Sequence, residues 1–306
     1  MSDPVKIVEC PRDAWQGLPG VIAPEVKAGY LRKVIDAGFT HIDAVSFVSS
    51  AAVPQMANSE RVLQLLAPPR HIEIVGIVVN RKGAERAIRT GAVRTLGFPY
   101  SISPQFLQRN QHQTPVEALH ELRQIAALTR DARLDVVTYL SMAFGNPYGD
   151  EWNIRGVLEA CDMLIESGVR QISLADTVGL ASPERIAETV AAVLAALHDI
   201  EFGVHLHARR DHAPPRIRAA FDAGCRRFDA AIGGLGGCPF AQDALVGNIP
   251  TEILIAELEE CGALLPPLGP LDDLIRAGAK IAAGCGTSVT KSQSSCKAMP
   301  SVWRAD

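Results

Sequence analysis

Short apolar segments alternate with longer amphipathic segments along almost the whole chain. Each apolar segment is rich in Val, Ile and Leu, which is typical of strands buried on both faces of a sheet. We therefore predict one strand for each apolar segment. The predicted strands cover residues 5–9, 41–44, 72–79, 93–98, 134–142, 169–174, 201–207 and 227–232.

The amphipathic segments are predicted to be helices. Glycines such as Gly38 and Gly168 follow their ends, and prolines such as Pro115 and Pro183 stand at their starts, as is usual for helix boundaries. The predicted helices cover residues 25–37, 82–89, 115–128, 152–166, 183–197, 214–223, 251–261 and 271–283.

The strand–helix unit recurs eight times, each unit being about thirty residues long, and no polar linker divides the series. This arrangement predicts a single (β/α)8 TIM barrel with a short C-terminal helical extension. A doubly wound open sheet is the alternative, but the glycine-rich segment 233–237 follows the eighth strand and not the first. We therefore predict a catalytic barrel domain over residues 1–286 and a tail over residues 287–306.

The composition of the chain argues against a nucleic-acid-binding, membrane or secreted protein. The chain has 306 residues, of which 47% are hydrophobic, and its net charge of −4 gives no indication of a nucleic-acid or membrane partner. No apolar run reaches the length of a membrane span, and the N-terminus lacks the pattern of a signal peptide. The seven cysteines include no Cys-x-x-Cys pair, which indicates a reducing compartment. We expect a cytoplasmic protein.

His205 and His207 are two residues apart near the end of a predicted strand, so their side chains point to the same face. Two neighbouring imidazoles can share a divalent metal ion, although they can also be two partly exposed histidines at a strand end. In a TIM barrel, reacting groups lie at the carboxyl ends of the strands and in the loops that follow. Other polar candidates at these ends are Gln16, Asp43, Ser46, Ser101, Ser103, Arg109, Asn110, Asn146, Asp176 and Thr177.

Two further residues complete a possible metal site. Asp13 follows the first strand and Asn248 follows the eighth, so both would join His205 and His207 at one end of the barrel. Two nitrogen and two oxygen ligands, with room for substrate oxygens and water, suit Mg²⁺ or Mn²⁺ better than a closed zinc site. A loop-capping role for Asp13 is the alternative.

Several segments together resemble hydroxymethylglutaryl-CoA lyases, a family of metal-dependent TIM-barrel lyases whose first strand ends in Arg-Asp. The resemblance covers nearly the whole chain, and its most specific part is the histidine pair together with the glycine–cysteine segment. The segments that carry it are residues 5–9 and 11–13, residues 46–49 and 53–56, residues 176–179, His205-x-His207, residues 234–240 and Gly247-Asn248.

The resemblance implies roles for individual residues. Asp13, His205, His207 and Asn248 resemble the metal ligands of the family, and Arg12 resembles its catalytic arginine. Cys238 resembles the catalytic cysteine of the glycine-rich loop, although a small buried thiol is the alternative. Substrate-binding roles are assigned to residues at the same strand ends, namely Gln16, Asp43, Ser103, Tyr148 and Thr177.

The implied reaction is the cleavage of a 3-hydroxyacyl-CoA thioester to release acetyl-CoA. A metal ion would acidify the hydroxyl, and Arg12 would stabilise the enolate oxygen that develops at the thioester. The acid and the base could be Asp13, His205 or Cys238. Two alternatives are a related barrel aldolase or Claisen-condensing enzyme that acts on 2-oxo acids, and a binding protein without activity. We expect an acyl-CoA substrate and a homodimer.

Some residues depart from the family pattern, and we expect all of them to lie next to the metal. Trp15 stands where the family has a smaller residue, Ala208-Arg209 follow the histidine pair, and Leu245-Val246 precede Gly247. Because a larger side chain removes pocket volume, we expect hydroxymethylglutaryl-CoA to be a poor substrate, and Trp15→Leu to restore its use.

Overall fold

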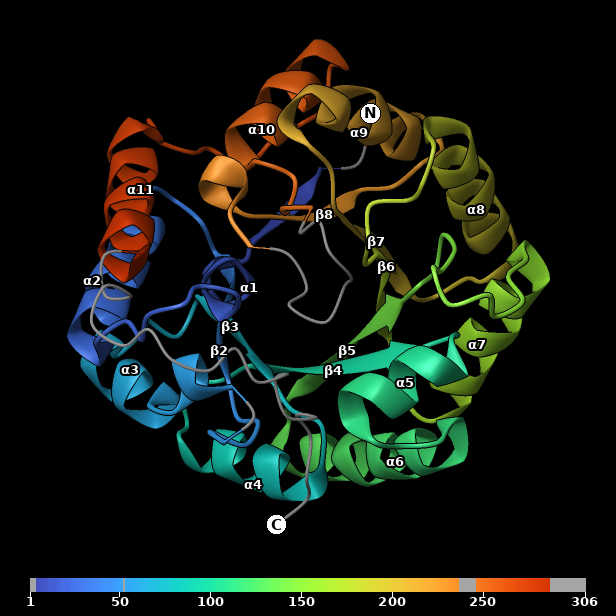
Figure 1. Ribbon diagram of the computed structural model, residues 1–306, viewed down its shortest axis with the longest axis horizontal. Helices are drawn as coiled ribbons and strands as arrows, with labels where there is room; N and C mark the ends of the chain where they lie inside the picture. Colours follow the sequence, from blue (N-terminus) through green and yellow to red (C-terminus); the bar gives the residue numbers. More distant parts are fainter. Residues whose placement is uncertain (1–3, 52, 237–245, 287–306) are drawn as a thin grey trace, which may run out of the picture.

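The computed structural model describes residues 4–51, 53–236 and 246–286, and these residues form a closed parallel β-barrel. The strands are hydrogen-bonded in chain order, and the last pairs with the first (Figure 1). They are β1 (Lys6–Glu9), β2 (His41–Ser46), β3 (Glu73–Ile77), β4 (Thr95–Ser101), β5 (Asp135–Ser141), β6 (Gln171–Asp176), β7 (Glu201–Leu206) and β8 (Arg227–Ala230). The predicted TIM barrel is confirmed, and the open sheet is excluded.

Helices surround the barrel, and most of them form an outer ring (Figure 1). They are α1 (Pro11–Gln16), α2 (Pro24–Asp36), α3 (Ser59–Leu66), α4 (Arg81–Arg89), α5 (Pro104–Gln111), α6 (Pro115–Ala132), α7 (Ile154–Glu166), α8 (Pro183–Ala196), α9 (Ala213–Asp222), α10 (Thr251–Glu260) and α11 (Asp272–Gly286). The C-terminal extension is α11, which lies beside α2. None of the described helices is long and apolar enough to cross a membrane. The predicted tail lies outside the described residues.

Three helices, α1, α3 and α5, were not predicted from the sequence. Each has eight residues or fewer, and helices this short gain most of their stability from packing and not from local propensity. In α1, for example, Ala14 and Trp15 are buried. The consequence for the site is that Arg12 and Asp13 project from a fixed helix instead of a loop.

The barrel interior has an apolar half and a polar half. Val75, Ile77, Val137 and Tyr139 form a small core of their own on the side of β3 and β5, separate from the main core. On the side of β6 to β8, the buried polar residues Ser173, Arg227 and Asp229 replace apolar ones. The polar half therefore lies on the side of the histidine strand, β7.

Trp15 does not lie where the sequence indicated. Its side chain is only 2% exposed and belongs to the main core. Its ring meets that of Tyr30 edge to face at 5.6 Å, and Lys27 Nζ lies 5.9 Å from its centre. The expected contact of Trp15 with the substrate is therefore wrong, because the helical turn of α1 directs the ring toward α2.

We predict that Trp15→Ala lowers the free energy of unfolding by about 3–5 kcal/mol, since it leaves a large cavity in a packed core. Urea denaturation measures this change. The control is Val116→Ala, because Val116 is 77% exposed and should change stability by less than about 0.5 kcal/mol. A stability close to that of the wild type for Trp15→Ala would contradict the core position of the ring.

Candidate metal centre and substrate cavity

Three of the predicted metal ligands converge at the mouth of the barrel. Asp13 lies on α1, His205 near the end of β7, and His207 just beyond that end. Each offers one ligand atom, and these atoms all lie within 4.8 Å of one another. The two imidazole rings have centroids 5.1 Å apart. One carboxylate and two imidazoles are thus close enough to hold a single ion.

On each histidine, Nδ1 lies near an oxygen atom of the protein. His207 Nδ1 lies 2.9 Å from the carbonyl oxygen of Val246. A carbonyl only accepts, so Nδ1 donates and the lone pair is on Nε2. His205 Nδ1 lies 3.6 Å from Asp229, while its Nε2 lies 3.9 Å from Asp13 Oδ2. Both residues therefore present Nε2 to the metal centre.

Asn248 completes the set of candidate ligands. Its Nδ2 donates to Asp13 Oδ2 at 2.8 Å and to the carbonyl of Leu235 at 2.9 Å, which fixes the orientation of the amide. Its Oδ1 is buried and has no hydrogen-bond partner among the described residues. An acceptor oxygen without a donor, beside a carboxylate and two imidazoles, fits a bound divalent cation.

Glycines allow the backbone to approach the metal centre closely. A Cβ at Gly247 would lie 2.2 Å from the carbonyl oxygen of Gly234. A Cβ at Gly236, where φ is +97°, would lie 2.9 Å from Asp13 O and 2.8 Å from Asn248 Nδ2. The glycine-rich segment therefore serves the contact between Asn248 and Asp13, and a side chain at either glycine would push them apart.

Arg12 is held beside the metal centre by three side chains. Its Nε donates to Asp43 Oδ1 at 3.1 Å, and its Nη2 donates to Asp43 Oδ2. Its Nη1 donates to Asp13 Oδ1 at 2.9 Å and to Gln16 Oε1 at 3.1 Å. These bonds use the Nε hydrogen, both Nη1 hydrogens and one Nη2 hydrogen. One Nη2 hydrogen remains without a partner among the described residues.

The charges around Asp13 keep it ionised. Burial works to raise the pKa of Asp13, but the guanidinium of Arg12 and the neighbouring His205 and His207 outweigh it. The pKa of Asp13 is therefore held well below its ordinary value. Burial, together with the neighbouring His205, lowers the pKa of His207 to about 4. A carboxylate and a neutral imidazole are the forms that bind a metal ion.

A cavity of about 120 Å³ opens beside these residues at the barrel mouth. Six of the residues assigned from the sequence line it, namely Arg12, Asp13, Gln16, Thr177, His205 and His207. The other lining residues are Ile77, Pro99, Phe106, Asn110, Gln111, Tyr139, Ser141 and Ala175. Except for Asn110, none of these was named from the sequence. Tyr139 and Ser141 could have been found, because alternation along the predicted strand 134–142 places both on one face near its end.

Asp43, Ser103 and Tyr148 do not line this cavity. Asp43 lies behind Arg12, and Ser103 Oγ accepts from Phe106 N–H at 3.1 Å as the cap of α5. The ring of Tyr148 contacts Phe106 and lies under the guanidinium of Arg109, 4.6 Å away. Ser103 and Tyr148 thus support α5, and their direct contact with substrate stays a prediction.

The residues that depart from the family pattern also lie away from the described cavity. Ala208 is buried, Arg209 is exposed, and Val246 contributes its carbonyl to His207. Cys238 and Leu245 lie outside the described residues. The expected exclusion of hydroxymethylglutaryl-CoA by Trp15, Ala208 and Val246 therefore loses its structural basis. Among the described residues, Phe106 and Gln111 on α5 form part of the cavity wall instead.

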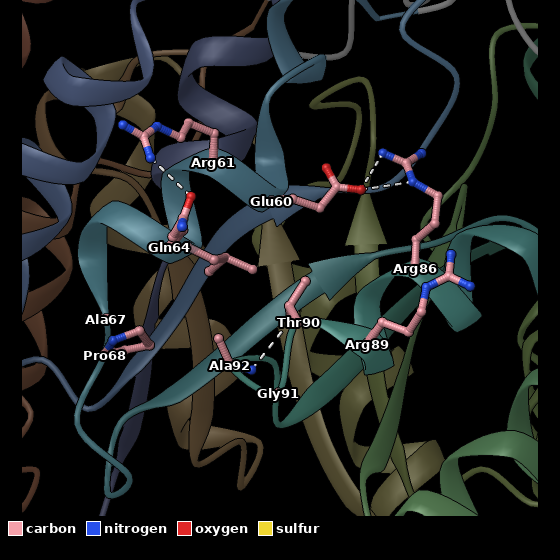
Figure 2. Close-up of a pocket in the computed structure, with 11 residues that line it drawn as sticks. Glu60, Arg61, Gln64, Ala67, Pro68, Arg86, Arg89, Thr90, Gly91 and Ala92 are labelled. Atoms are coloured by element: carbon pink, nitrogen blue, oxygen red, sulfur yellow. Dashed lines mark hydrogen bonds and ion pairs between the residues drawn. The ribbon is translucent and has the colours of Figure 1, made fainter.

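A larger groove, of about 670 Å³, lies between α3 and α4 on the outside of the barrel (Figure 2). Two of its arginines are engaged with other lining residues: Arg86 pairs with Glu60 at 2.7 Å, and Arg61 donates to Gln64. No histidine, cysteine or free carboxylate lines it. Chemistry, and not volume, therefore identifies the barrel mouth as the functional site.

Known proteins are similar in sequence to this chain over most of its length. A sequence profile of the HMGL-like family matches residues 5–277. Hydroxymethylglutaryl-CoA lyase YngG of Bacillus subtilis is 31% identical over 250 residues, which cover 82% of this chain and 83% of that protein. The (R)-citramalyl-CoA lyase of Chloroflexus aurantiacus is 32% identical over 262 residues, 82% of each chain.

A solved structure shares the fold over almost the whole chain. It is an HMG-CoA lyase from A. baumannii in complex with coenzyme A and 3-methylmalate, with a TM-score of 0.85 and 30% identity. The superposition covers 98% of this chain and 99% of that one. Profile, sequence and structure agree with the resemblance read from the histidine pair and the glycine–cysteine segment. The chain therefore belongs to the hydroxymethylglutaryl-CoA lyase family.

Proposed function

We propose that this chain is a divalent-metal-dependent carbon–carbon lyase that cleaves a 3-hydroxyacyl-CoA thioester and releases acetyl-CoA. The observation that carries the proposal is the buried Oδ1 of Asn248, which lacks a partner beside Asp13, His205 and His207. Relatives with the names hydroxymethylglutaryl-CoA lyase and (R)-citramalyl-CoA lyase support the reaction type. The CoA complex of the A. baumannii relative supports an acyl-CoA substrate.

The proposed ligands are Asp13, His205, His207 and Asn248. When bound, the ion supplies a Lewis acid that makes the substrate hydroxyl more acidic. Arg12 then supplies a fixed positive charge for the thioester oxygen as the carbon–carbon bond breaks, through its remaining Nη2 hydrogen. Asp43 and Gln16 hold the guanidinium in place, so little reorganisation is needed during the reaction.

Two protons must move in this reaction: the hydroxyl proton leaves, and the enolate carbon of acetyl-CoA receives one. Asp13, which Arg12 keeps ionised, is suited to the role of metal ligand and not to that of an acid, and its lowered pKa also makes it a weak base. His205 lies 3.9 Å from Asp13, within the same set of ligands. We assign the proton donor to Cys238, on the family resemblance of its glycine-rich segment.

The acyl group would occupy the cavity between the metal centre and α5. Since α5 follows β4, it lies across the barrel mouth from β8 and β1 (Figure 1). The acyl groups named in the two relatives differ by one methylene, and such a difference is worth roughly 1–3 kcal/mol in discrimination. We propose that Phe106 and Gln111 choose between them by setting the length of the cavity.

Some finer features complete the proposal. The ion would be Mg²⁺ or Mn²⁺, because the donor set mixes nitrogen and oxygen and leaves positions for substrate. The enzyme would act in the cytoplasm as a homodimer, with residues 1–286 as the catalytic domain and residues 287–306 as a tail.

We predict that a chelator abolishes acetyl-CoA release and that Mg²⁺ or Mn²⁺ restores it. His207→Ala should weaken Mn²⁺ binding, measured by titration calorimetry, while the melting temperature of the metal-free protein changes little. His71→Ala is the control, because His71 is exposed and far from the site in sequence. Full activity in chelator-treated protein would remove the proposed metal site.

Arg12→Gln should lower kcat by roughly 10²–10³ with little change in KM, because the lost charge acts on the developing oxyanion. Arg12→Lys should not restore the rate, since an ammonium cannot match the paired contact with Asp43. Steady-state rates of acetyl-CoA release measure both variants, with Arg61→Gln on α3 as the control. An increase in KM alone would make Arg12 a binding residue and exclude its proposed role at the enolate.

Gln111→Ala should lengthen the cavity and favour the acyl group with the extra methylene. The ratio of kcat/KM for hydroxymethylglutaryl-CoA over citramalyl-CoA should rise about tenfold, while Mn²⁺ affinity stays the same. Gln108→Ala is a matched control, because it makes the same change on the exposed face of α5. An unchanged ratio in Gln111→Ala would show that α5 does not determine the choice of acyl group.

A further inference from the structure

A buried carboxylate lies directly below the metal centre, inside the barrel. Asp229 on β8 is in register with His205 on β7, and its Oδ2 lies 3.6 Å from His205 Nδ1. Ser173 on β6 donates its hydroxyl to the same oxygen at 2.7 Å. Asp229 is 3% exposed, and its side chain is fully enclosed. This residue has no place in the reaction described above.

Arg227 forms an ion pair with the other oxygen of this carboxylate, which accepts no hydrogen bond among the described residues. Its Nη2 lies 3.6 Å from Asp229 Oδ1, and its Nη1 lies 3.4 Å from Glu201 at the bottom of the barrel. Arg227 is 2% exposed, so a full charge lies inside the barrel. Gly203 on β7 makes the space for it, because a Cβ there would lie 2.7 Å from Arg227 Cγ.

The buried ion pair of Arg227 and Asp229 is not explained by a gain in folding stability. Removing two charges from water costs several kcal/mol per ion, and a buried ion pair often fails to repay this cost. The opposite wall of the same barrel is filled with Val75, Ile77 and Val137 instead. The presence of Ser173, Arg227 and Asp229 in the barrel interior therefore needs an explanation other than stability. The contact of Asp229 with His205 supplies that explanation.

His205 and His207 differ in the group that lies next to Nδ1. His207 Nδ1 has a neutral carbonyl as its hydrogen-bond partner, whereas His205 Nδ1 makes no hydrogen bond among the described residues and lies 3.6 Å from the anionic Asp229. A carboxylate on one nitrogen fixes the tautomer of a ligating histidine, fixes the angle of its ring, and makes the other nitrogen a stronger donor. For His205, that other nitrogen is Nε2, on the side of Asp13.

We propose that Asp229, held by Arg227 and Ser173, is a positioning residue that orients His205 and keeps its Nε2 available to the metal ion. The inference rests on the proposed metal site. Asp229 does not contact the substrate, so its removal acts on metal affinity before it acts on the chemical step. Glu201, the second partner of Arg227, carries the same charge but does not contact His205.

The experiment compares Mn²⁺ binding to purified wild type, Asp229→Asn and Glu201→Gln by titration calorimetry and by the electron paramagnetic resonance signal of free Mn²⁺. Asp229→Asn should weaken Mn²⁺ binding roughly 10- to 100-fold, and Glu201→Gln should bind as the wild type does. The melting temperature of each metal-free protein, measured in parallel, separates loss of folding from loss of affinity.

The other outcomes decide against the proposal in different ways. Wild-type affinity in Asp229→Asn, or an equal loss in both variants, overturns the role of Asp229. Absence of Mn²⁺ binding in the wild type overturns the metal site itself. If Asp229→Asn does not fold, Ser173→Ala decides, because it keeps every charge and removes only the hydrogen bond that fixes Asp229 Oδ2. A loss of roughly two- to fivefold in affinity supports the proposal, and an unchanged affinity overturns it.

Discussion

The pairing of β8 with β1 assembles the site of this protein. Residues 6–9 lie in register with residues 227–230, which closes the barrel and brings the beginning of the chain next to its far end. Asp13, four residues beyond β1, can then accept a hydrogen bond from Asn248, 235 residues away in sequence. The proposed metal ligands therefore meet only because the barrel closes, and no local segment contains them.

Close backbone approach is the second requirement. Gly236 and Gly247 let the segment around Asn248 pack directly against Asp13 and Gly234, at distances that no side chain would permit. The same segment supplies the carbonyl of Val246 to His207. The glycine-rich sequence thus shapes the metal centre, whereas in a doubly wound sheet a similar sequence would bind phosphate.

Two buried arginine–aspartate pairs lie on either side of the metal centre. Arg12 and Asp43 lie at the barrel mouth, and Arg227 and Asp229 lie in the interior below. Buried pairs of this kind contribute little net stability, but they fix geometry. In the first pair, Arg12 lines the cavity and Asp43 holds the guanidinium. In the second pair the aspartate contacts the ligand His205 and the arginine holds it.

The amino-acid sequence was enough to predict the barrel and the convergence of Asp13, His205 and His207, because strand periodicity and helix boundaries are local signals and strand ends meet on one face of a TIM barrel. Its motifs were enough to predict the family. Packing in three dimensions was needed to show where Trp15 points, that α5 forms part of the cavity wall, and that Ser103 and Tyr148 support α5. Short helices such as α1 and α5 depend on packing more than on helix propensity, so the local sequence pattern does not predict their direction. Asp229 is a further example. From the sequence it is one residue of a predicted buried strand, and its position beneath His205 becomes known only from the register between β7 and β8.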